Sequence, residues 1–465
     1  MCSINLKLLT LGVIISSLFF CQITTIAQKS NSLSDKAYKN GILQKIDSLI
    51  ECKYVLIDKA GKCAEEFRQL YKSGKYDTIT DSKKFAKIVT DDLQTITNDK
   101  HVSLRTIEPS DIGEKPESGL HNSIRLSRLG MKENLGFYKL EWINEKIGYL
   151  DLRRFYSISM AKEMITAAMK FLSNAGAIII DIRENGGGAG DYLSSYFLKY
   201  PTQLSSVYYR ENNYTEEFWT SREIDGEPRT DVPLYILIGK KTFSASEAFA
   251  YDLKALKRAT LIGETTKGGA HSYDAFKIND QFEINISTAR SFSPITGSNW
   301  EAVGVIPDIQ VPSAKALDTA IVLADKAAKE FAEVKDAKLK IAVDAMQNHL
   351  NNAEIFFKQN RISEANSALD SIFSVAAKIN LLNEFFVNVL AYNYYISKNE
   401  QIMTAIMLKS TKLFPSSSTA FENLALTYYD YGKKDLALEY YKKVLELNPA
   451  NTNAQKRVKE LENKK

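Results

Sequence analysis

Histidine and cysteine are scarce in this chain, whose 465 residues include only four of each. A His-Glu-x-x-His pattern and closely spaced cysteine pairs are both missing, so a metal centre has no support in the sequence. An excess of one charge is also lacking, since 60 Lys and Arg residues stand against 56 Asp and Glu residues and the net charge is +4. Because there is no basic tract and no basic-aromatic pattern, we expect no nucleic-acid partner.

Long apolar runs are missing after the first 27 residues, so we expect no membrane span in the mature chain. At the N-terminus, Lys7 precedes an apolar stretch, Leu8–Phe20, that is short for a membrane span. The small residues of Thr25-Ile26-Ala27 then predict a signal peptide over 1–27, with cleavage before Gln28. We therefore expect an exported, periplasmic protein. An extracellular protein, or one that is lipid-anchored at Cys21, is the alternative.

Removal of the signal peptide would leave two cysteines, Cys52 and Cys63. In an oxidising compartment these two could form a disulfide between two expected helices. Sequence spacing leaves the pairing open, because a disulfide requires a particular Cα separation.

Apolar periodicity divides the mature chain into three parts. Residues 28–100 show helical stripes and predict a small helical domain. Residues 101–312 alternate short β runs with helices, which predicts an α/β fold with a mixed sheet. Residues 313–465 have no strand pattern and are expected to be all-α. The expected strands of the middle part are Ile147–Leu152, Ala177–Ile182, Leu234–Ile238, Ala259–Ile262 and Phe282–Thr288, and its expected helices lie near Met160–Leu172 and Ala245–Leu256.

A period of 34 residues marks the last part of the chain. Pro415 lies 34 residues before Pro449, and a degenerate earlier unit lies near Ala353–Ile379. The pattern resembles tetratricopeptide repeats, which implies stacked helix pairs that bind peptides or partner proteins. The alternative is a helical appendage that only covers the α/β domain. The signature positions are Phe421, Leu424, Ala425, Tyr428, Ala437, Tyr441 and Pro449, with Leu390, Ala391 and Tyr394 in the preceding repeat.

A serine stands where a strand turns into an amphipathic helix. The β run that starts at Tyr235 ends in a polar turn, and Ser244 follows at the expected helix start. Unpaired backbone N–H groups at a helix start can stabilise an oxyanion, so this hydroxyl is a candidate nucleophile. Ser244 and Glu247 also form a capping box, which is a purely structural explanation of the same residues.

Three further elements are candidates for a site. The buried run Ala177–Ile182 leads into Gly186–Gly188, where backbone N–H groups can approach a ligand. The dinucleotide and Walker fingerprints both fail in this chain, so we expect no phosphate-binding cofactor. His101 lies where the helical part meets the first β run, and Glu301 lies in a strand-turn segment that ends the α/β part.

Together and in this order, the four elements resemble the tail-specific (carboxy-terminal processing) serine peptidases. The resemblance covers about Asn40–Pro312 and is greatest for the branch of the tricorn protease core and the interphotoreceptor retinoid-binding protein modules. It implies a crotonase-like or Clp-protease-like α/β core and hydrolysis of peptide bonds in peptides or unfolded protein tails. No cofactor is implied. A catalytically silent peptide- or ligand-binding scaffold is the alternative.

The resemblance also implies roles for individual residues. Ser244 corresponds to the nucleophile, His101 to the general base and Glu301 to the acid that orients or assists it. Ala245 corresponds to one oxyanion-hole donor. The second donor comes from the glycine turn, where Gly187 and Gly188 are the choices.

Two departures leave the base open. The other branch of the family uses a lysine 25 residues after the serine, and that position is Gly269 in this chain, with Lys267 two residues earlier. Lys100 precedes His101, and a nearby cation would lower the imidazole pKa. His271 and Lys267 therefore stay as alternative bases. The region between His101 and Ile147 is too short for a PDZ domain, so we expect the repeats to recruit substrates or protein partners.

Overall fold

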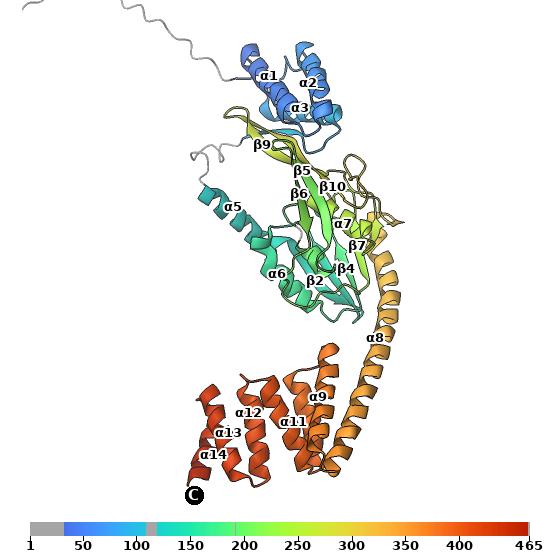
Figure 1. The fold of residues 1–465 in the computed structure, drawn as a ribbon. Helices are drawn as coiled ribbons and strands as arrows, with labels where there is room; N and C mark the ends of the chain where they lie inside the picture. Colours follow the sequence, from blue (N-terminus) through green and yellow to red (C-terminus); the bar gives the residue numbers. More distant parts are fainter. Residues whose placement is uncertain (1–31, 108–118, 191, 464–465) are drawn as a thin grey trace, which may run out of the picture. The chain divides into compact units, whose positions relative to one another are not determined.

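The helical N-terminal domain consists of α1 (Lys36–Lys53), α2 (Ile57–Lys72) and α3 (Ser82–Thr97), drawn in blue in Figure 1. The computed structural model describes residues 32–107, 119–190 and 192–463. The side chains of Asp35 and Asp81 accept hydrogen bonds from the first turns of α1 and α3, which satisfies N–H groups that the helices leave free. The helices share one apolar core with β-strand residues such as Phe282 and Ile284. The helical domain is therefore built directly onto a sheet.

The possible disulfide between Cys52 and Cys63 is not formed. Both cysteines are free thiols, and Cys52 is exposed on α1 whereas Cys63 is buried in the core of the helical domain. The Cys63 thiol lies 3.9 Å from the carbonyl oxygen of Ile96. Because one side chain faces solvent and the other faces the core, the disulfide expectation is corrected here. The signal peptide and Cys21 lie outside the described residues.

An antiparallel sheet connects the helical domain to the rest of the core. It contains β1 (Ser103–Thr106), β5 (Gln203–Tyr209), β6 (Tyr214–Trp219), β9 (His271–Lys277) and β10 (Phe282–Phe292). The order is β1-β10-β5-β6, and β9 also pairs with β10, with His271 opposite Arg290. This register places the start of β9 next to the segment that leads into β1.

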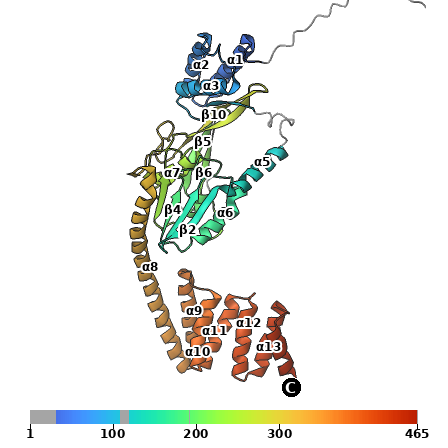
Figure 2. The same cartoon turned by 180° about the vertical axis from the view of Figure 1, so that it is seen from behind.

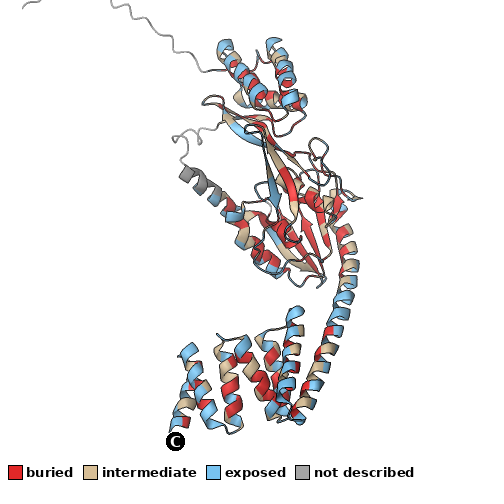
Figure 3. Ribbon diagram, viewed as in Figure 1, coloured by how far each residue is buried: buried red, intermediate tan, exposed pale blue. Residues whose placement is uncertain are grey.

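A second, six-stranded sheet has the order β11-β8-β7-β4-β3-β2. Its strands β7 and β8 are parallel, as are β8 and β11. All five residues of β4 are buried, as Figure 3 shows, which explains the continuous apolar run in the sequence. The strands are β2 (Phe137–Ile143), β3 (Ile147–Leu152), β4 (Ala177–Asp181), β7 (Leu234–Ile238), β8 (Thr260–Gly263) and β11 (Ile309–Gln310).

Three helices accompany the sheets: α5 (Gly119–Lys132), α6 (Ile158–Phe171) and α7 (Ala245–Ala255). Figures 1 and 2 both show α6 beside β2. Helix α7 contacts β5 of the antiparallel sheet and β8 of the mixed sheet. The residue at the start of α7 therefore lies where the two sheets come together.

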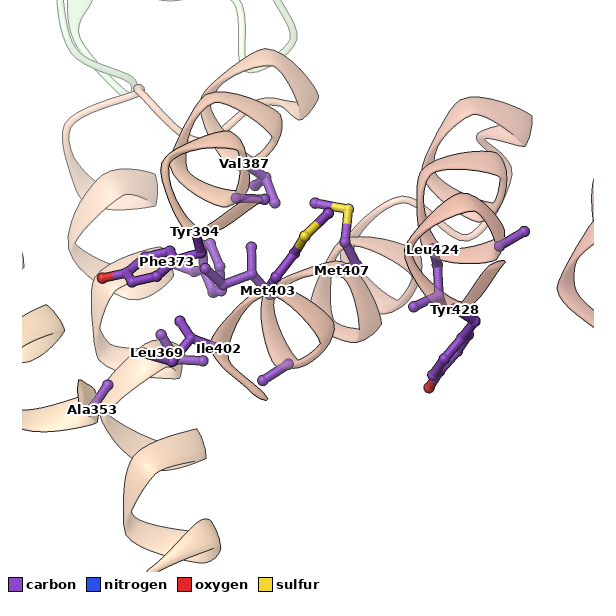
Figure 4. Packing of buried hydrophobic residues seen from close by; sticks show 14 of the residues in the cluster. Ala353, Leu369, Phe373, Val387, Tyr394, Ile402, Met403, Met407, Leu424 and Tyr428 are labelled. Atoms are coloured by element: carbon purple, nitrogen blue, oxygen red, sulfur yellow. The ribbon is translucent and has the colours of Figure 1, made fainter. Parts of the chain in front are cut away.

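The C-terminal region is all-α, as expected. It contains α8 (Ser313–Lys358), α9 (Ile362–Lys378), α10 (Glu384–Ile396), α11 (Glu400–Leu413), α12 (Ser418–Asp430), α13 (Lys434–Leu447) and α14 (Thr452–Glu462). Figure 4 shows Tyr394, Met403 and Leu424 among the buried residues that join successive helices. Leu424, Ala425, Ala437 and Tyr441 of the repeat signature are buried, because the small and aromatic residues interlock between helices. Among the described residues, no helix has the length and apolar character that a membrane crossing requires.

Candidate active site

Ser244 occupies a sharp turn between β7 and α7. Its φ is 60° and its ψ is −123°, a conformation that L-residues rarely adopt and that costs about 1–3 kcal/mol. The preceding turn is fixed by Thr242, whose hydroxyl donates to the carbonyl of Ile182 at 2.8 Å and accepts from the N–H of Gly239 at 3.0 Å. The strained turn directs the Ser244 hydroxyl out of the chain at the start of a helix.

Glu247 is fully buried and stabilises the turn at Ser244. Its carboxylate accepts the N–H of Ser244 at 2.8 Å, so it reaches back to the helix start as the sequence predicted. The same carboxylate accepts the N–H groups of Gly268 at 2.6 Å and Gly269 at 2.9 Å, and the hydroxyl of Thr266 at 2.5 Å. Burial raises the pKa of Glu247, and these four donors act against that rise. One carboxylate thus fixes both the serine turn and the loop before β9.

His101 is the histidine that meets the serine. Its Nε2 lies 3.3 Å from the Ser244 Oγ, and the imidazole is stacked on the ring of Phe243 with centroids 4.5 Å apart. Burial lowers the pKa of His101 to about 4, with His271 and Lys267 contributing in the same direction and Asp99 opposing it. The imidazole is therefore neutral at neutral pH, which is the state in which it can accept the serine proton.

Ala245 and Gly188 are two of the residues expected to supply oxyanion-hole donors, and both line a cavity at Ser244. Within the part of the chain that the structure describes, neither N–H makes a hydrogen bond. Gly187 differs, because its N–H donates to the Asn185 Oδ1 at 2.9 Å. The expectation for Gly187 as an oxyanion donor is therefore corrected, since the side chain of Asn185 already takes its proton.

Gly187 has a steric role instead. A Cβ at this position would lie 2.8 Å from the Ser244 Cβ and 2.7 Å from the carbonyl oxygen of Phe243. Asn185 fixes this close approach through two further hydrogen bonds. Its side-chain Nδ2 donates to the backbone carbonyl of Leu152 at 2.9 Å, and its backbone carbonyl accepts the N–H of Phe243 at 3.1 Å. Sequence analysis missed Asn185, although its place between a buried strand and three glycines was a usable signal.

The segment between α3 and β1 places Asp99 behind His101. Helix α3 ends at Thr97, with Asn98 as its C-cap at a φ of 52°, and the chain then turns at Lys100 and His101. In this turn Asp99 and His101 are buried and Lys100 is exposed, and the Asp99 Oδ1 accepts the backbone N–H of His101 at 2.9 Å. The ammonium of Lys100 donates to the backbone carbonyl of Lys267 and does not lower the imidazole pKa, contrary to the expectation.

Glu301 does not contact His101. Its Oε2 accepts the backbone N–H groups of Ala270 at 2.6 Å and His271 at 3.0 Å, and lies 3.7 Å from the His271 Nδ1. The His271 Nδ1 makes its hydrogen bond to the Asp99 Oδ2 at 2.7 Å. The expected contact between Glu301 and His101 is therefore replaced by one between Glu301 and the start of β9.

Neither alternative base makes a hydrogen bond to the serine. His271 is bonded to Asp99, and the ammonium of Lys267 lies 4.5 Å from the centroid of the Phe243 ring. Gly269 stands where the other branch of the resembled family has its lysine. A Cβ on Gly269 would lie 2.7 Å from the His101 Cε1 and 2.6 Å from the Phe243 Cζ. The histidine and the phenylalanine thus fill the space that a side chain at Gly269 would need.

Two cavities meet at Ser244. The larger has a volume of about 540 Å³, touches His101 and Gly188, and is bordered by Arg153 and Arg154. The smaller has a volume of about 250 Å³ and also reaches Ala245 and Asp252. Its apolar lining consists of Leu204, Val207, Phe218, Trp219, Ala248, Ala270 and Trp300. The serine therefore has open space on both sides.

Comparison with known families identifies the core. Residues 146–311 match "Peptidase family S41", and residues 32–134 match "N-terminal domain of Peptidase_S41 in eukaryotic IRBP". The α/β core belongs to peptidase family S41. Residues 418–451 match the tetratricopeptide repeat, so the last repeat of the C-terminal region is confirmed. The S41 core, its helical N-terminal domain and the all-α repeat region agree with the expected fold class.

Among its relatives, the chain is 29% identical over 205 residues to the carboxyl-terminal-processing protease of a Picosynechococcus species, covering 43% of this chain and 47% of that protein. It is 33% identical over 169 residues to the protease of that name from a Synechocystis species, covering 35% of this chain and 38% of that protein. The chain thus spans less than half the length of either relative. A putative peptidase from Parabacteroides merdae matches with a TM-score of 0.46 and 18% identity, over 61% of this chain and 96% of that one.

Proposed function

We propose that this S41 protein is an exported serine-type peptidase that hydrolyses peptide bonds in peptides or unfolded protein tails. The observation that carries the proposal is the pair formed by Ser244 and His101, with 3.3 Å between the Oγ and the Nε2 on a strained turn. The free N–H groups of Ala245 and Gly188 supply the donors that a developing oxyanion needs. Export rests on the N-terminal sequence pattern.

The chemistry follows from these four groups. As the Ser244 Oγ attacks the peptide carbonyl carbon, the His101 Nε2 takes the hydroxyl proton and the oxyanion accepts the N–H groups of Ala245 and Gly188. When the C–N bond breaks, the imidazolium gives its proton to the leaving amine and an acyl-enzyme ester remains. A water molecule then attacks the ester, again giving its proton to His101, and Ser244 is regenerated as the acid leaves.

The smaller cavity supports binding of an apolar side chain next to the scissile bond. It touches both Ser244 and Ala245, and its lining is largely aromatic and aliphatic. A peptide residue whose carbonyl lies at the serine can place its side chain there, because pockets of this kind gain most from burying apolar groups. The larger cavity leaves room for the rest of the peptide chain.

Fluorophosphonate labelling tests the proposal. The wild-type protein is expected to be labelled on Ser244 and to cleave an unstructured peptide library, and Ser244→Ala to do neither. Ser246→Ala is the matched control, because its hydroxyl is buried and bonds to the carbonyls of Asn185 and Phe243. Labelling of the folded Ser246→Ala fraction should persist. Equal labelling of wild type and Ser244→Ala would remove the nucleophile, and a wild type without turnover would favour the silent scaffold.

We also infer that the repeats bind protein partners or substrates. Helix α10 exposes Phe385, Tyr392 and Ile396, which are spaced so that they share one side of the helix. Large exposed apolar residues on a repeat helix support a binding surface. The double variant Phe385→Ser/Tyr392→Ser should raise KM for an unfolded protein while hydrolysis of a short peptide is kept. Ile355→Ser, at a similarly exposed position of α8, is the control, and an equal rise in KM would contradict the inference.

A further inference from the structure

A buried cluster of titratable groups lies behind the proposed base and takes no part in the steps above. Asp99, His271 and Glu301 offer side-chain atoms that all lie within 4.8 Å of one another. Asp99 lies in the segment between α3 and β1, His271 is the first residue of β9, and Glu301 lies in the loop after β10. Asp99 is completely buried and His271 is almost so. A cluster of this kind requires either a structural or a functional explanation.

We propose that Asp99, and not Glu301, is the carboxylate that positions His101, and that His271 in turn positions Asp99. The inference rests on the proposed peptidase function, because it assigns a role in presenting His101 to Ser244. Asp99 and His271 do not touch the reacting atoms. They are positioning residues.

The geometry around Asp99 carries the proposal. The Asp99 Oδ1 accepts the backbone N–H of His101 at 2.9 Å and lies 3.9 Å from the Nδ1 of the same residue. That Nδ1 is buried and makes no hydrogen bond in the described part of the chain. An unpaired buried ring nitrogen is unfavourable, and the carboxylate oxygen is the acceptor beside it. Contacts of this kind are often long without substrate and tighten when substrate binds.

His271 fixes the other side of Asp99. Its Nδ1–H donates to the Asp99 Oδ2 at 2.7 Å, so the two carboxylate oxygens face one histidine each. The ring of Tyr54, from the end of α1, packs edge-on against the His271 ring with centroids 6.5 Å apart. Glu301 secures the backbone of the same strand start by accepting the N–H of His271. His271 is thus held by its ring and by its backbone.

Charges around the site agree with this assignment. Burial and the nearby Asp99 raise the pKa of Glu301 to about 7. Burial by itself would raise the pKa of Asp99. The hydrogen bond and the charge of His271 outweigh this effect, so the pKa of Asp99 lies below its usual value. The other charged or titratable groups that act here are Lys267, which lowers the His101 pKa, and Tyr54, whose pKa is raised by burial. At neutral pH, Asp99 is therefore the carboxylate that carries a full charge beside the His101 ring.

Two carboxylate-to-amide variants test the assignment, because each replaces one carboxyl group of the same cluster with little change in shape. Asp99→Asn should lower kcat by about 10³-fold with little change in KM, since the orientation of the base is lost. Glu301→Gln should cost less than about tenfold, because it acts only through the strand start. The acid limb of kcat/KM should move to lower pH in Asp99→Asn and stay in place in Glu301→Gln. A loss in Glu301→Gln that equals or exceeds that in Asp99→Asn would overturn the proposal.

Two variants of His271 extend the test if Asp99→Asn folds poorly. His271→Asn places an amide N–H near the position of the Nδ1, whereas His271→Leu removes the donor while keeping an apolar ring-sized group. His271→Asn should keep at least about tenfold more activity than His271→Leu, which is the order of one hydrogen bond to a charged group. Equal activities of the two folded variants would show that His271 is not a positioning residue.

A measurement without catalysis separates this inference from the proposed function. The pKa of the His101 imidazole can be followed by NMR in wild type, Asp99→Asn and Glu301→Gln. It should fall in Asp99→Asn, because a neighbouring negative charge is removed, and hold in Glu301→Gln. An unchanged pKa in Asp99→Asn refutes the positioning role even in an active enzyme. If Ser244 is never labelled but the pKa falls as expected, the proposed function fails and the Asp99–His101 interaction stands.

Discussion

The substitution Gly269→Ala tests whether the space beside the serine belongs to His101. The added Cβ would lie 2.7 Å from the His101 Cε1 and closer still to the ring of Phe243, whereas carbon atoms normally approach to about 3.5–4.0 Å. The imidazole would have to move by about 1 Å, and its Nε2 is already 3.3 Å from the Ser244 Oγ. A displacement of this size is expected to lower kcat by about 10²-fold. Overpacking should also cost about 1–3 kcal/mol of unfolding free energy.

The assay combines kcat with the rate of fluorophosphonate labelling and a urea unfolding curve. Gly41→Ala is the matched control, because a Cβ there meets nothing within 4 Å and the helix should gain about 0.5–1 kcal/mol. In a His101→Ala background, Gly269→Ala should bring a smaller further loss of kcat than in wild type, because only its contact with the Phe243 ring then remains. If Gly269→Ala kept kcat within about three-fold of wild type, where about 10²-fold is expected, His101 could not occupy the catalytic position.

Four further predictions concern the site. The acid limb of kcat/KM should lie near pH 4, because burial lowers the pKa of His101 to about 4 from the ordinary histidine value of about 6.5. An acid limb at neutral pH in a pH–rate profile would contradict this. The same shift should make the fold less stable as pH falls from about 6.5 towards 4, since protons then bind the unfolded chain more strongly. Glu247→Gln should lower the unfolding free energy by about 1–3 kcal/mol and slow labelling, because its carboxylate accepts four hydrogen bonds, and unchanged urea midpoints would refute that role. Ala248→Phe should fill the cavity of about 250 Å³. It should therefore raise KM more for peptides with a bulky apolar residue at the scissile bond than for peptides with alanine there, which kinetics on a substrate series would measure.

Apolar pattern and turn residues were sufficient to predict the strands that run through the interior. Ile147–Leu152 and Leu234–Ile238 were predicted with the bounds that the structure shows, because each is a compact apolar run between polar turns. Strand β6 was missed because its residues are mostly exposed and include two glutamates. Strand β9 was missed for the same reason, since a polar strand has no apolar run or alternation that identifies it.

The site could be predicted where one local pattern forms the contact, and not where distant segments meet. Ser244 was located from the strand-to-helix turn, and its pairing with His101 across 143 residues came from the family resemblance. Glu301 was expected to act on His101, but it lies beside His271. The position of His271 depends on the pairing of β9 with β10, which a local sequence pattern does not show. Asp99 was available to a simpler argument. An aspartate two residues before a histidine can accept the backbone N–H of that histidine in a local turn and so lies beside it.

Burial of His101 keeps its imidazole neutral but also weakens it as a base, and the cluster of Asp99, His271 and Glu301 offsets the second effect. A dry environment keeps His101 neutral, but the same burial lowers its pKa to about 4 and so weakens it as a proton acceptor. The imidazolium that forms during attack on a peptide would be destabilised most in this environment, unless a negative charge lies next to it. Asp99 is the group that raises the pKa of His101, and its own charge depends on the hydrogen bond from His271. In the proposed mechanism, a histidine at this depth therefore depends on a second histidine, and the two lie before β1 and at the start of β9.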